Sequence, residues 1–217
     1  MVNFIQMNDM NKSFNTEQEA FWNGEFGSEY TARNRGGKIV AGNLAMFSRI
    51  IARTDNVGSV MELGANIGMN IQAIRQLLPE ASLSAVEINA DAVDELKALG
   101  RIQVYHESIL DFQPDRKFDL VLIKGVLIHI NPDRLNDVYD LAHAASQRYI
   151  CFAEYYNPTP VALPYRGHEE RLFKRDFAGE LMDLHPGLKL VDYGFCYHRD
   201  PAFPLDDITW FLMEKTA

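Results

Sequence analysis

The sequence predicts an α/β fold: one seven-stranded mixed sheet with helices on both faces. Three observations predict it. Five short apolar runs of the strand type alternate with helix-like segments. This alternation is typical of a parallel sheet covered by helices. Two further strand-type runs close the chain. The link between these two runs is too short for a crossover helix, so we expect them to pair antiparallel.

The parallel strands are predicted at residues 59–63, 83–88, 102–105, 118–123 and 149–154. The run at 118–123 is apolar on both faces and is therefore expected near the centre of the sheet. Helices are predicted between the strands, at residues 68–78, 90–100 and 132–145. Asn89 is a favourable N-cap for the second helix, and Pro132 is favourable at the start of the third.

The two ends of the chain depart from this regular pattern. Residues 14–57 predict an N-terminal helical cap. Three prolines among residues 155–171 predict a long irregular segment after the fifth strand, followed by a helix at 174–184. The closing strands are expected at residues 188–197 and 207–215.

Length and composition favour a single globular domain over residues 1–217, with its core at 58–217. The formal net charge of −9 argues against general nucleic-acid binding, because an acidic surface repels phosphates. Cys151 and Cys196 match no metal-ligand spacing, so no metal is expected. The sequence lacks a run of about 18 apolar residues and a signal-peptide pattern, which predicts a cytoplasmic protein without a membrane span.

The strongest local signal follows the first predicted strand, in the pattern Glu62-x-Gly64-x-x-x-Gly68. Glycine allows a sharp turn and a close approach of the backbone to a ligand. A dinucleotide fingerprint, Gly-x-Gly-x-x-Gly, would also need glycine at two positions that hold Asn66 and Met69. The pattern therefore disfavours a dinucleotide. Glu62, Gly64, Asn66 and Gly68 are candidate cofactor-binding residues.

Further candidate cofactor residues follow the next strands in order. Glu87 ends the second strand, where a carboxylate can accept hydrogen bonds from both hydroxyl groups of a ribose. Such a carboxylate suits several adenosine-containing cofactors, so it does not discriminate among them. The neighbouring loops supply the remaining candidates, which are Ile88, Ser108, Ile109, Lys124 and Gly125.

These ordered pieces resemble the motifs of class I S-adenosylmethionine (SAM)-dependent methyltransferases, which have a Rossmann-like fold. Residues 26–34, 154–158, 165–168 and 171–177 further resemble the methylases associated with pseudaminic acid biosynthesis. The resemblance implies SAM as cofactor and a small-molecule acceptor, such as a sugar or nucleotide-sugar of surface-glycan biosynthesis. It also implies that the N-terminal cap is a lid, in which Tyr30 and Arg33 approach the cofactor and Arg33 pairs with its methionine carboxylate.

The acceptor side is predicted from residues after the fourth and fifth strands. Methyl transfer to an alcohol or ammonium group requires removal of a proton. His129 is the first candidate base, since histidine ordinarily titrates near neutral pH, and Glu154 is the second. His129 also has a purely structural interpretation, as a residue that caps or packs beneath the following helix. Candidate residues for an anionic acceptor lie in the next segment: Tyr155, Tyr156, Tyr165, Arg166 and Arg171.

Two alternatives to a methyltransferase remain open from the sequence. One is an NAD-dependent oxidoreductase, which the two missing glycines disfavour. The other is a non-catalytic SAM-binding module. Nothing in the sequence indicates an oligomeric state.

Overall fold

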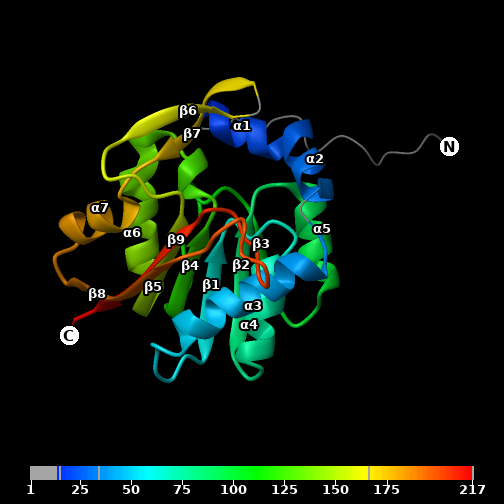
Figure 1. Cartoon of the computed structure of the whole chain (residues 1–217). Helices are drawn as coiled ribbons and strands as arrows, with labels where there is room; N and C mark the ends of the chain where they lie inside the picture. The colour runs from blue at the N-terminus through cyan, green and yellow to red at the C-terminus, as the bar shows by residue number, and fades with distance from the viewer. Residues whose placement is uncertain (1–13, 15, 34, 166, 217) are drawn as a thin grey trace.

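The computed structural model describes residues 14, 16–33, 35–165 and 167–216. Seven strands form one mixed sheet, as predicted, and their order is β3-β2-β1-β4-β5-β9-β8 (Figure 1). β1 to β5 are parallel, and β9 runs antiparallel to both β5 and β8. The strands are β1 Ser59–Leu63, β2 Ser82–Glu87, β3 Gln103–His106, β4 Phe118–Lys124, β5 Ser146–Glu154, β8 Leu188–Phe195 and β9 Thr209–Lys215.

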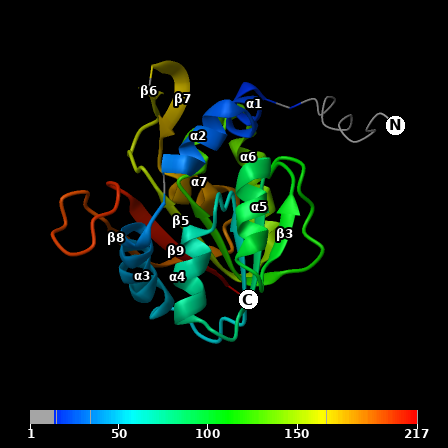
Figure 2. The ribbon, with the colours of Figure 1, turned by 90° about the vertical axis from the view of Figure 1, so that its right-hand side faces the viewer.

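Helices cover both faces of the sheet. One face is covered by α3 Gly37–Ile51, α4 Met69–Leu77 and α5 Ala90–Ala98, which Figure 2 shows side by side. The other face is covered by α6 Leu135–Ala145 and α7 Phe177–Leu184. Pro132 begins a short 3-10 turn, Pro132–Arg134, directly before α6. The helix predicted at 174–184 begins later, at Phe177, because Lys174 still belongs to a strand.

The alternation of side chains along the central strand builds two cores. Leu120 and Leu122 of β4 pack with α3 and α4, whereas Val121 and Ile123 pack with α6 and α7. Successive residues of a strand point to opposite faces, so an uninterrupted apolar run is buried on both sides. Cys151 of β5 is fully buried in the α3–α4 core.

The segment predicted to be irregular is instead a β-hairpin, which corrects the sequence-based expectation. Its strands are β6 Val161–Tyr165 and β7 His168–Lys174, and they pair antiparallel. The register shifts between Leu163 and Tyr165, where Pro164 has no N–H to donate. Both strands of a two-stranded hairpin are edges, and an edge tolerates a proline that a central strand would not.

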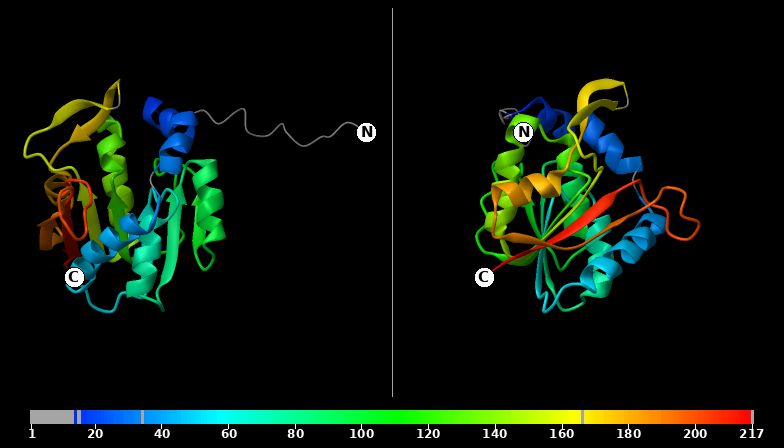
Figure 3. Two further views of the ribbon diagram at one scale, coloured as in Figure 1. Left: turned by 45° about the vertical axis from the view of Figure 1, so that its right-hand side comes forward. Right: turned by 60° about the vertical axis from the view of Figure 1, so that its left-hand side comes forward.

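The N-terminal residues form helices, as predicted, and these lie over the carboxyl ends of the parallel strands. They are α1 Glu17–Asn23 and α2 Glu25–Arg33. Figure 3 shows α1 and the hairpin above the same edge of the sheet, and the rings of Phe26 and Tyr165 meet there with centroids 6.1 Å apart. In the part of the chain that the structure describes, no helix is long and apolar enough to cross a membrane.

Candidate functional site

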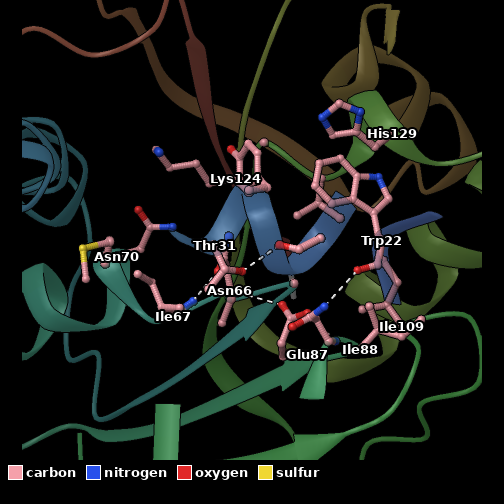
Figure 4. Close-up of a pocket in the computed structure, with 18 of the residues that line it drawn as sticks. Trp22, Thr31, Asn66, Ile67, Asn70, Glu87, Ile88, Ile109, Lys124 and His129 are labelled. Atoms are coloured by element: carbon pink, nitrogen blue, oxygen red, sulfur yellow. Dashed lines mark hydrogen bonds between the residues drawn. The ribbon is translucent and has the colours of Figure 1, made fainter. Parts of the chain in front are cut away.

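A cavity of about 420 Å³ lies between the N-terminal helices and the carboxyl ends of the strands (Figure 4). Its floor comes from the loops after β1, β2 and β4, where the strand order reverses between β1 and β4. Ligands of open α/β sheets bind at such a switch point, and pockets of this volume accommodate small molecules.

Two glycines shape the loop after β1 for different reasons. Gly64 lines the cavity with a φ of 77°, and a Cβ there would lie 2.6 Å from Cγ2 of Val126. Gly68 has the same φ and lies at the N-cap of α4, where a Cβ would meet the side chains of Leu96 and Leu99. Gly64 therefore leaves room for Val126 on the cavity wall, whereas Gly68 allows α4 to pack closely against α5.

Glu62 is fully buried behind the cavity wall. Its Oε1 accepts a hydrogen bond of 2.6 Å from Nδ2 of Asn70, and Asn70 itself lines the cavity. Burial raises the pKa of Glu62 to about 8, against the hydrogen bond from Asn70 and the charge of Lys124. Glu62 thus reaches the cavity through Asn70.

Glu87 lines the cavity and joins two of its loops. Its Oε2 accepts a hydrogen bond of 2.7 Å from the backbone N–H of Asn66, and its Oε1 accepts one of 2.8 Å from the N–H of Asn89. Burial raises its pKa, and these backbone hydrogen bonds act in the opposite direction. Each carboxylate oxygen can accept more than one hydrogen bond, so both can still receive ligand hydroxyl groups.

The end of the cavity near β2 and β3 is lined by Ile88, Ser108 and Ile109. The hydroxyl of Ser108 donates to Oε1 of Glu19, which belongs to α1. The Oε2 of Glu19 accepts from the backbone N–H of Thr16 at 2.8 Å and completes the N-terminal cap of that helix. One buried carboxylate therefore ties the N-terminal cap to this end of the cavity.

The opposite end is more polar and is lined by Lys124, Gly125, Asn43 and two residues of the β8–β9 loop, His198 and Asp206. Burial lowers the pKa of Lys124, while nearby carboxylates, including that of Asp206, raise it. Asn43 is fully buried, and neither atom of its amide has a hydrogen-bond partner among the residues that the structure describes. Buried amide groups without partners are costly, so this end favours a polar ligand.

His129 is brought to the same cavity by a single 3-10 turn, Leu127–His129. Its ring centroid lies 4.6 Å from that of Trp22 in α1 and 4.9 Å from that of Tyr165 in the hairpin. Figure 4 shows His129 and Trp22 together at one side of the cavity, away from Glu87. Tyr30 also lines the cavity and meets Trp22 edge-on at 5.2 Å.

The remaining candidates lie outside the cavity lining. Glu154 is buried and accepts hydrogen bonds from the backbone of the loop after β4. Tyr155 is partly buried, and Tyr156 is 41% exposed and contacts Phe211, with ring centroids 5.7 Å apart. The structure does not describe Arg166, and the side chains of Arg33 and Arg171 also lie outside the described part.

Several cavity residues were missed by sequence reasoning: Trp22, Thr31, Asn43, His198 and Asp206. Thr31 donates a hydrogen bond of 3.1 Å to Oδ1 of Asn66, which ties α2 to the loop after β1. These residues come from the cap and from the last loop of the chain. They carry no local motif, because only the folded sheet brings them to one cavity.

The sequence matches no family model and no curated protein. Solved structures match it instead. An S-adenosylmethionine-dependent methyltransferase from Clostridium acetobutylicum ATCC 824 aligns with a TM-score of 0.63 and 13% identity, over 89% of this chain and 98% of that chain. The 1,6-didemethyltoxoflavin-N1-methyltransferase of Burkholderia thailandensis, solved with 1,6-didemethyltoxoflavin and S-adenosylhomocysteine, aligns with a TM-score of 0.66 and 15% identity, over 92% and 87% of the two chains.

Magnesium protoporphyrin IX methyltransferase from Synechocystis PCC 6803, solved with SAM, aligns with a TM-score of 0.64 and 12% identity, over 94% of this chain and 100% of that chain. Identities this low establish the fold alone. The chain therefore has the Rossmann-like fold seen in these methyltransferases.

Proposed function

We propose that this chain is a SAM-dependent methyltransferase that acts on a small molecule. The observation that carries the proposal is the contrast between the two ends of one cavity. One end has the carboxylate of Glu87, placed to bind the hydroxyl groups of a ribose. The other end has the ammonium of Lys124, the carboxylate of Asp206 and the buried amide of Asn43, which has no partner among the described residues. SAM has the matching ends, a nucleoside and an α-amino acid.

The nucleoside end fits an adenosine. Glu87 would accept the ribose hydroxyl hydrogens, and the apolar side chains of Ile88 and Ile109 would lie against the adenine ring. Gly64 leaves room for the centre of the ligand beside Val126.

The polar end fits a zwitterion. Lys124 would bind the carboxylate, Asp206 would bind the ammonium, and the amide of Asn43 has both a donor and an acceptor to offer. A pairing of Arg33 with the same carboxylate stays a prediction from the sequence. An NAD molecule has no amino-acid end, so this part of the cavity favours SAM over the oxidoreductase alternative.

SAM would supply a methyl group on a sulfonium, which is already a good leaving group. The protein's work is then mainly to align the acceptor, and proximity and orientation supply most of the acceleration. His129 would take the acceptor's proton, and Trp22 and Tyr30 offer ring faces or edges to a bound acceptor.

A small-molecule acceptor is supported by the volume of the cavity and by the Burkholderia protein, which was solved with such a compound. A sugar or nucleotide-sugar, and any link to pseudaminic acid, rest on the sequence resemblance alone and gain no support from the comparisons. An anionic acceptor bound by Arg166 and Arg171, and a cytoplasmic location, stay predictions from the sequence.

Calorimetry with three ligands tests the proposal. We expect SAM and S-adenosylhomocysteine (SAH) to bind and NAD to give no heat of binding. Tight NAD binding without SAH binding would favour an oxidoreductase. SAH binding without any transfer of labelled methyl groups into small molecules of a cell extract would favour a non-catalytic module.

A further inference from the structure

Glu154, the last residue of β5, holds the loop that follows β4. Its Oε1 accepts hydrogen bonds from the backbone N–H groups of Val126, at 2.9 Å, and Leu127, at 3.0 Å. Two successive backbone donors thus converge on one side chain that is only 3% exposed.

The chain runs from Val126 and Leu127 through Ile128 directly into His129. The N–H of His129 donates to the carbonyl of Val126 at 2.8 Å, which closes the 3-10 turn. The orientation of this turn sets where the imidazole lies on the cavity wall, between Trp22 and Tyr165. Anything that anchors the N-terminal side of the turn therefore also anchors the ring.

Other parts of the loop are held by backbone contacts. The N–H of Gly125 donates to the carbonyl of Ala153 at 3.0 Å, beside Glu154. The end of β5 consequently fixes residues 125–127 through both its backbone and one carboxyl group. An oxygen of this group can accept both bonds whether or not the group is protonated.

We infer that Glu154 is a positioning residue that holds His129 in place at the cavity, rather than an alternative base. Its role in catalysis rests on the proposed function, but its hold on His129 does not. Glu154 lies outside the cavity lining, behind the backbone of the loop, so it acts on a bound ligand through this loop and His129.

The test compares Glu154→Gln and Glu154→Ala with a matched control, Glu214→Gln. Glu214 lies on β9 and pairs with Arg148 at the surface, so its loss removes a carboxylate without touching the loop. NMR spectra of histidine-labelled protein give the readout, because the rings of Trp22 and Tyr165 shift the ring resonances of His129. The His129 signals, among those of six histidines, are identified by their absence in His129→Ala.

We expect the His129 signals to move toward those of an exposed histidine in Glu154→Ala and part of the way in Glu154→Gln. Exchange of the amide hydrogens of Val126 and Leu127 should become about 10-fold faster or more in Glu154→Ala, because the shared acceptor of both groups is lost. Glu214→Gln should change neither. If Glu154→Ala does not fold, Glu154→Gln decides alone.

Unchanged His129 signals and unchanged amide exchange in a folded Glu154 variant would overturn the inference. SAH binding is measured alongside, because Gly125 and Val126 of the loop that Glu154 holds also line the cavity. If the parent itself fails to bind SAH, the proposed function fails, while the NMR comparison still decides the role of Glu154.

Discussion

The backbone N–H of Asn66 donates to Oε2 of Glu87 at 2.7 Å, across 21 residues of sequence. This bond joins the loop after β1 to the end of β2, and Asn66 adopts a φ of 48° to make it. Glu87 therefore has two roles in the proposed site: it orders the glycine loop and it faces the ligand.

Replacing Glu87 tests the ribose contact. We expect Glu87→Ala to weaken SAH binding by about 1–3 kcal/mol, the usual loss for hydrogen bonds to a charged group. Glu87→Gln should lose less, because its carbonyl oxygen still accepts hydrogen bonds. Calorimetry with SAH measures both, with Glu80→Ala as control, since Glu80 is an exposed carboxylate before β2. Normal SAH affinity in Glu87→Ala would contradict the assignment.

Gly64 has a matched control in Gly100, because both have positive φ. A Cβ at Gly64 would meet Val126, whereas one at Gly100 would meet nothing within 4 Å. Both alanine variants should lose about 1–2 kcal/mol of unfolding free energy from left-handed strain. Gly64→Ala should lose more unfolding free energy than Gly100→Ala, and it alone should also lose SAH binding. Denaturant unfolding and calorimetry measure the two effects, and equal behaviour of the variants would argue against a close ligand approach at Gly64.

Much of the fold was predictable because each element has its own local signal. The apolar runs predicted the strands, and the first was placed at its observed bounds, Ser59–Leu63. The hairpin was missed because prolines normally argue against strands, and its pairing depends on Leu172 and Phe173 being buried against the rest of the chain. Local sequence does not contain that contact.

The site divides in the same way. Residues at the end of a strand or in the loop after it, such as Glu87 and His129, could be assigned to the edge of the sheet from sequence order. Asn43 and Asp206 come from a helix face and a late loop, where the order of elements does not indicate a ligand. The hydrogen-bond acceptor role of Glu154 likewise depends on the register of β4 beside β5.

Stability should depend on pH through Glu62. Burial raises its pKa from 4.5 to about 8 in the folded protein, so the folded state keeps a proton that the unfolded state has released. The contribution of Glu62 to the free energy of unfolding is fully present below pH 4.5 and is lost as pH rises to about 8, with a slope of up to about 1.4 kcal/mol per pH unit.

Glu62→Gln removes this titration. The difference in unfolding free energy between Glu62→Gln and the parent should therefore grow in favour of the variant from pH 5 to pH 8, and denaturant titrations measure it. A constant difference would mean that Glu62 is ionised in the fold.

Asn43 should contribute to binding and not to stability. Its buried amide has no partners among the described residues, so Asn43→Leu should leave the unfolding temperature unchanged or higher. The same variant should bind SAH about 10-fold more weakly, the effect of one lost hydrogen bond to a charged group. Adenosine is the matched ligand, because it lacks the amino-acid end. Its affinity should not change, and an equal loss for both ligands would place the role of Asn43 elsewhere.

His129 should act in turnover and not in cofactor binding. It lies on the cavity wall beside Trp22 and contacts Tyr165 of the hairpin, away from Glu87 and the nucleoside end. If it removes the acceptor's proton, His129→Ala should lower methyl transfer by about 10²–10⁴-fold. SAH affinity should stay within about 3-fold of the parent, since no cofactor contact is assigned to this ring.

The measurement is transfer of labelled methyl groups from SAM into small molecules of a cell extract. His143→Ala is the control, because His143 stacks on His185, outside the cavity lining. Loss of SAH binding or of folding in His129→Ala would instead indicate that the ring serves to pack α1 and the hairpin against the loop after β4. Unchanged turnover in a folded variant would remove His129 from the mechanism and leave alignment of the acceptor as the protein's contribution.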